Sequence, residues 1–101
     1  MNNRNKLHEL LCETLGSRQV YFQPPESVKM KYPAIVYSRN RIDNEHADDG
    51  VYIQSPSYSV TVIDKNPDSE IVENISLLPR CRFDRHYISD NLNHDVFTIY
   101  Y

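Results

Sequence analysis

The sequence predicts an α+β fold in which two helices pack on one face of a mixed or antiparallel β-sheet. Two segments carry apolar residues at helical spacing, and several others carry the alternating or continuous apolar patterns of strands. The expected order of elements is α-β-β-β-α-β-β, in which residues 51–54 and the strand that begins at residue 58 count as one interrupted strand, within one domain that covers residues 1–101. This arrangement buries both helical stripes and leaves the other sheet face available to a partner.

Residues 4–15 form the first expected helix. Its later apolar residues lie three, four and eight positions after Leu7, which places them on a single stripe. The stripe consists of Leu7, Leu10, Leu11 and Leu15. Gly16 follows, and glycine commonly ends a helix because it tolerates positive φ. A helix of this length is marginal in water, so we expect it to pack on the sheet.

Two strands and a short extended segment are expected between the first helix and residue 58. Residues 19–22 and 32–39 are rich in apolar and aromatic side chains, and residues 51–54 resume an extended pattern. The charged segment 40–50 has no apolar periodicity, so it is expected to be a mobile loop or the tip of a long hairpin.

The segment 58–71 predicts a strand that leads directly into the second helix and forms the centre of the fold. Apolar residues alternate along the strand, with β-branched residues on the other parity. The helix is expected over residues 67–78, with Asn66 as its N-cap and Pro67 in its first turn. Its apolar stripe consists of Ile71, Val72, Ile75 and Leu78.

Two final strands, at residues 80–87 and 93–101, surround a polar turn at residues 89–91. Strict alternation in the first of them places one set of side chains on one face and a second set on the other. The first set is Arg80, Arg82 and Asp84, and the second is Cys81, Phe83 and Arg85.

With Arg39 and Arg41, these arginines are expected to form a basic patch interleaved with tyrosines, which suits phosphate contact or base stacking. The alternative is pairing with carboxylates between strands or subunits, because arginine is favoured at protein interfaces. The chain has 11 basic and 14 acidic residues and a net charge of -3, which favours the interface over nucleic acid.

Composition narrows the functional classes further. Only two glycines occur, too few for a phosphate-binding loop. Eight tyrosines and no tryptophan suit strands that are half buried or covered by a partner. The two cysteines, without a recognisable signal peptide or membrane-spanning apolar run, indicate a reducing cytosolic environment.

No catalytic, cofactor or metal site is expected. The four histidines (His8, His46, His86 and His94) do not stand at ligand spacing. Asp84 with His86 and His94 with Asp95 are candidate acid–base pairs, but no nucleophile stands in a recognisable setting. An enzyme is therefore the least favoured class.

Four stretches carry a resemblance to a known family. They are Tyr32–Tyr37 (YPAIVY), Tyr58–Ser69 (YSVTVIDKNPDS), Arg82–Tyr87 (RFDRHY) and Asn91–Tyr100 (NLNHDVFTIY). The chain resembles the tail-terminator proteins of siphophages, also called tail-completion or head–tail joining proteins. The resemblance extends from about Leu7 to the C-terminus.

This resemblance implies a virion protein, assembled in the bacterial host cytoplasm, that forms a ring, usually a hexamer. The ring caps the tail tube, ends tail growth and joins the tail to the head, and DNA passes through its lumen. The implied partners are further copies of the chain, the major tail protein and a head–tail connector protein. No enzymatic activity, cofactor or membrane is implied.

Opposite-sign surfaces on one chain suit the two different patches of a ring contact. The residues expected at subunit or partner interfaces are Arg39, Arg41, Asp43, Glu45, Asp48, Asp49, Arg80, Arg82, Arg85, Tyr100 and Tyr101. Two other functions stay open: another small head–tail connector (neck) protein, and a module that binds single-stranded nucleic acid on a Tyr/Arg sheet face.

Overall fold

The computed structural model describes residues 3–25, 28–40, 44–47, 50–54 and 57–101, with 44–47 and 50–54 described by their backbone. Within these residues the α+β class and the expected succession of elements are confirmed, and β3 adds a strand within segment 40–50. The elements are α1 (Asn3–Leu15), β1 (Val20–Phe22), β2 (Ala34–Arg39), β3 (Asn44–Ala47), β4 (Gly50–Gln54), β5 (Ser57–Asp64), α2 (Glu70–Ser76), β6 (Cys81–Ser89) and β7 (Leu92–Tyr100).

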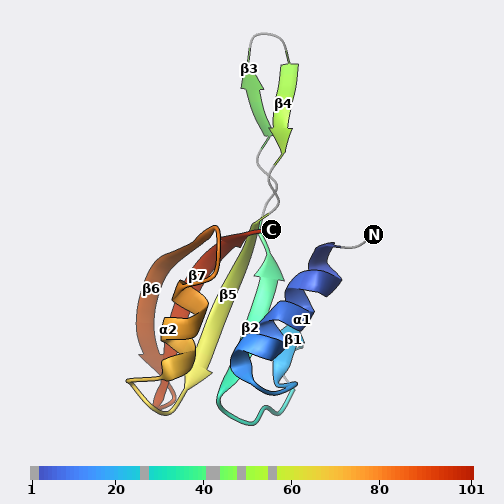
Figure 1. The fold of residues 1–101 in the computed structure, drawn as a ribbon. Helices are drawn as coiled ribbons and strands as arrows, with labels where there is room; N and C mark the ends of the chain where they lie inside the picture. The colour runs from blue at the N-terminus through green and yellow to red at the C-terminus, as the bar shows by residue number, and fades with distance from the viewer. Residues whose placement is uncertain (1–2, 26–27, 41–43, 48–49, 55–56) are drawn as a thin grey trace.

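Five strands form one mixed sheet in the order β1-β2-β5-β7-β6. β1 runs parallel to β2, and the other neighbours pair antiparallel. β5 is the central strand, as the segment 58–71 predicted. Both helices lie on the same side of the sheet (Figure 1), so one sheet face is covered and the other is not covered by a helix. We call the second the open face.

The core lies between the helices and the covered face. Both apolar stripes are confirmed, because Leu7 and Leu11 of α1 and Ile75 of α2 are fully buried. They pack with sheet residues that the pairing register places on one face, namely Val20, Ile35, Tyr37, Tyr58, Val60, Val62, Phe97 and Ile99. The apolar periodicity therefore identifies the buried side of each helix correctly.

The start of α2 differs from the prediction. Ser69, not Asn66, is the N-cap, and its hydroxyl accepts a hydrogen bond from the backbone N–H of Ile71. The carboxylate of Asp64 accepts from the N–H of Asn66, and the side chain of Asn66 accepts from the N–H of Asp68. These two local turns compete with helix formation, so the helix begins after them and Pro67 lies outside it.

The β6–β7 connection confirms the predicted polar turn. Asp90 and Asn91 occupy positive φ values of 54° and 63°. Two consecutive residues of this kind form the tight turn whose twist matches antiparallel strands, and Asp and Asn tolerate it best after glycine.

β3 and β4 pair antiparallel in a sheet of their own. Of the two alternatives for segment 40–50, this pairing shows a hairpin over residues 44–47 and 50–54. The hairpin projects beyond the end of the five-stranded sheet (Figure 1), along the 49 Å long axis of a molecule whose other extents are 27 and 26 Å. Among the described elements, the two strands contact each other and make no extensive contact with any other.

Candidate functional site

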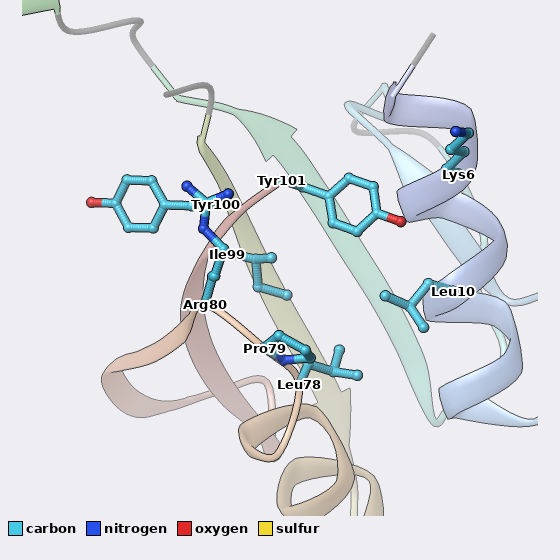
Figure 2. A pocket seen from close by; sticks show the side chains of 8 residues that line it. All are labelled: Lys6, Leu10, Leu78, Pro79, Arg80, Ile99, Tyr100 and Tyr101. Carbon is cyan, nitrogen blue, oxygen red and sulfur yellow. The ribbon is translucent and has the colours of Figure 1, made fainter. Parts of the chain in front are cut away.

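A pocket of about 510 Å³ lies between α1, the segment that follows α2, and the end of β7. Figure 2 shows that its lining comes from these three parts of the chain. Lys6 and Leu10 lie one turn apart on α1, so both reach the same side of the helix. The lining residues are Lys6, Leu10, Leu78, Pro79, Arg80, Ile99, Tyr100 and Tyr101.

The chain between α2 and β6 forms one wall of this pocket. Pro79 cannot continue the helix, and Arg80 has a positive φ of 59°, which redirects the chain into β6. The carbonyl of Arg80 accepts a hydrogen bond from the N–H of Tyr100 at 3.1 Å. A non-glycine residue with positive φ is uncommon, and such residues gather at functional sites.

The pocket combines an apolar floor with two cations at its edge. Ile99 is fully buried, and Leu10, Leu78 and Tyr101 pack against the core. Lys6 and Arg80 are exposed. This arrangement suits a bulky apolar side chain accompanied by a carboxylate.

The open face carries a second candidate site, on β6 and β7. Strict alternation was expected along β6, and this is wrong because a β-bulge lies between Phe83 and Arg85. Phe83 pairs with Phe97 and Arg85 with Val96, so Asp84 is the extra residue. The bulge therefore brings Arg85 to the same face as Arg82, which pairs with Thr98.

Aromatic rings lie on the same face as Arg82 and Arg85. Tyr87 pairs with His94 in the register, and their rings stack with centroids 4.6 Å apart and planes 11° apart. The guanidinium of Arg85 lies 6.0 Å from the centre of the Tyr87 ring and forms an ion pair of 3.2 Å with Asp84. Exposed rings beside guanidinium groups suit base stacking and phosphate contact.

The expected basic patch does not form as one cluster. Arg80 lines the pocket and Arg82 and Arg85 lie on the open face, whereas Arg39 lies on β2 opposite Tyr58, a residue of the covered face. Tyr100 and Tyr101 both line the pocket. Arg41, Asp43, Asp48 and Asp49 lie outside the described residues, and Glu45 lies in β3 with its side chain not described.

The structure gives His86 other neighbours than the expected Asp84. Nε2 of His86 lies 3.1 Å from Oδ1 of Asn93, and Asp95 is the residue opposite His86 in the register. Burial raises the pKa of Asp95 above its ordinary value, while His86 and His94 oppose this shift. Within the described residues, no group of three His, Cys, Asp or Glu side chains could hold a metal ion.

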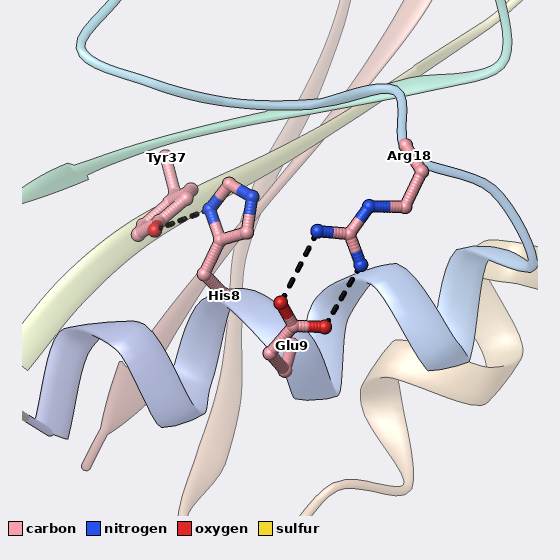
Figure 3. A network of polar contacts seen from close by, with 4 residues as sticks. All are labelled: His8, Glu9, Arg18 and Tyr37. Atoms are coloured by element: carbon pink, nitrogen blue, oxygen red, sulfur yellow. Dashed lines mark hydrogen bonds and ion pairs between the residues drawn. The ribbon is translucent and has the colours of Figure 1, made fainter.

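Polar contacts around α1 form the network drawn in Figure 3. The Tyr37 hydroxyl and Nδ1 of His8 are 2.8 Å apart and share a hydrogen bond, which ties α1 to β2. Arg18 donates two hydrogen bonds to Glu9, at 2.8 and 3.1 Å, and lowers the pKa of that carboxyl. These contacts connect neighbouring elements, and we assign them a structural role.

Sequence reasoning missed five pocket residues: Lys6, Leu10, Leu78, Pro79 and Ile99. Leu10 and Leu78 were expected only as members of the two helical stripes, and no functional role was predicted for Lys6, Pro79 or Ile99. The pocket arises where three distant segments meet, and neither spacing nor composition signals such a meeting.

No helix in the described part of the chain is long and apolar enough to cross a membrane. No family model, curated protein or solved structure matches the chain.

Proposed function

We propose that this chain is a structural assembly protein whose copies form a ring on the end of a phage tail tube. The hairpin β3–β4 carries the proposal: it projects from the body, and among the described elements it packs extensively on none. A two-stranded hairpin is at best marginally stable alone in water. A surface on a neighbouring molecule would supply the packing that its own chain does not.

A ring needs two different complementary patches on each subunit, because its contacts run head to tail. The hairpin supplies one patch and the body supplies others. The segment 41–54 contains four carboxylates against one arginine, whereas the pocket and the open face present exposed cations. Opposite charges favour encounter in one orientation and oppose contact between like patches.

In this role the ring, hexameric by the family resemblance, caps the tube and ends tail growth. One side of it meets the major tail protein and the other meets a head–tail connector protein, and DNA passes through the lumen. The mechanism needs surfaces and no bond chemistry, so neither a catalytic group nor a cofactor enters it.

Electron microscopy of the purified protein mixed with tail tubes tests the proposal. We expect a ring of density at one end of each tube. A matched variant replaces residues 44–54 with a flexible Gly/Ser linker, which should leave the core intact because β3 and β4 make no extensive contact with the described core elements. This variant should keep the circular dichroism of the core and lose the density. Bare tube ends with the unaltered protein would contradict the proposal.

A second candidate function follows from the open face. Stacked Tyr87 and His94 beside Arg82 and Arg85 form the kind of platform that binds single strands by stacking and phosphate contact. Titration of a fluorescent single strand at low salt tests it. Binding that weakens steeply with salt and is lost in Tyr87→Ala would support the platform, and a flat titration would exclude it.

A further inference from the structure

The pocket's two cations have no ion-pair partner among the described residues. Elsewhere in the described part of the chain, Arg18 pairs with Glu9 and Arg85 pairs with Asp84. Lys6 and Arg80 both stand exposed at the edge of an apolar floor. The site therefore fits a segment that offers a carboxylate next to a bulky apolar residue.

The hairpin of the same chain has this chemistry. Its segment carries Asp43, Glu45, Asp48 and Asp49 together with Val51 and Ile53. In the β3–β4 register, Glu45 stands directly opposite Ile53. Residues directly opposite each other in an antiparallel pair belong to one face of the hairpin. Glu45 and Ile53 are therefore adjacent across the two strands of the hairpin.

The open face fits this segment less well. Arg85 already pairs with Asp84 and lies near the ring of Tyr87. The open face also carries the half-buried polar residues Ser59, Thr61 and Thr98 beside its apolar ones. The existing ion pair of Arg85 and these polar residues favour the pocket as the receiving surface.

We infer that the pocket receives the acidic hairpin of a second copy of this chain. The hairpin projects away from its own body (Figure 1), so its partner pocket belongs to a neighbour. Each chain then gives its hairpin to one neighbour and accepts a hairpin from another, the head-to-tail contact that closes a ring. The inference rests on the proposed function, which it deepens by naming the contact.

Disulfide trapping between two variants tests the contact without tail tubes. One chain carries Ile53→Cys and the other carries Leu78→Cys, both with Cys81→Ser, and a tag on one chain distinguishes the mixed dimer by mass. Mild oxidation of the mixture should produce this dimer. The matched control is Leu77→Cys, because Leu77 is the preceding residue, is 81% exposed and lies outside the pocket lining.

An equal yield with Leu77→Cys would overturn the inference. A cross-link within one chain that carries both cysteines would also overturn it, because the hairpin would then occupy its own pocket. If Leu78→Cys fails to fold, Pro79→Cys replaces it, since Pro79 lines the same pocket and is exposed.

Charge exchange identifies the cations. Lys6→Glu with Arg80→Glu should lower the yield of mixed dimer by about tenfold, and Glu45→Lys with Asp48→Lys on the hairpin chain should restore it. Arg82→Glu with Arg85→Glu should leave the yield unchanged, and a loss there would assign docking to the open face instead. Rings on tail tubes without the cross-link would refute this contact alone, whereas the cross-link without rings would refute the proposed function alone.

Discussion

Ile75 holds α2 on the sheet, and Ile75→Ala is the substitution expected to release it. Ile75 is the buried residue of this seven-residue helix and has no exposed surface. A helix this short does not form alone in water, so its stability comes from packing. Removing three carbons costs about 2.4 kcal/mol of transfer free energy, at about 0.8 kcal/mol each. The remaining cavity raises the expected loss to about 3–4 kcal/mol.

Equilibrium urea denaturation followed by circular dichroism measures this loss directly. In thermal unfolding, Tm should fall by at least about 12 °C, since about 1 kcal/mol shifts a domain of this size by about 4–8 °C. Val72→Ala is the matched control on the same helix, because Val72 is only half-buried. Its expected loss is about 0.8 kcal/mol, from two carbons that are half removed from water.

The same substitution links stability to the pocket. Leu78, a pocket residue, lies two positions beyond the end of α2, so release of the helix also displaces one pocket wall. Hydrogen exchange should therefore accelerate in α2 and at Leu78 and Arg80 before it accelerates in the central strand β5. A free-energy loss for Ile75→Ala no larger than that for Val72→Ala would refute this account of how α2 is held.

Three further predictions concern single residues. Burial raises the pKa of Asp95, so its stabilising contribution is complete below the ordinary carboxyl pKa and is lost as pH rises through the folded-state pKa. Asp95→Asn should therefore raise Tm at neutral pH, with a smaller gain in acid, and a gain independent of pH would contradict this origin. Ser69→Ala should lower the free energy of unfolding by about 1 kcal/mol, as expected for a lost N-cap, and Asn66→Ala should lower it less. In urea melts the reverse order would restore Asn66 as the cap. Gly16→Ala should cost about 1 kcal/mol, because Gly16 has a φ of 82° with no atom near an added Cβ, so only backbone strain acts. An unchanged urea midpoint would exclude that strain.

The parts of the fold that depend on local periodicity could be predicted from the sequence. The leucine stripe of α1 and the buried position of Ile75 follow from spacing along one helix. The central position of β5 follows from its apolar pattern on both parities. The start of α2 could not be predicted as well. The side chains of Asp64 and Asn66 accept hydrogen bonds from backbone N–H groups, and these local turns delay the start of the helix.

The candidate site was predictable only in part. Tyr100, Tyr101 and Arg80 were expected at an interface, and all three line the pocket, whose interface role stays a prediction. Their grouping with Lys6 could not be predicted, because α1 and β7 are far apart in the sequence and come together only in the folded protein. The separation of Arg80 from Arg82 and Arg85 depends on a chain reversal and a bulge, and neither has a sequence signature.

The β-bulge at Asp84 lets β6 carry one residue more than the paired stretch of β7 without changing which side chains reach the open face. Phe83 and Arg85 stand opposite neighbouring residues of β7. Deletion of Asp84 would therefore remove the bulge and leave Arg85 and Tyr87 on the open face, whereas an unbulged β6 that kept Asp84 would move both to the covered face. The deletion would also remove the carboxylate that pairs with Arg85, so it would make the open face more basic without rearranging it.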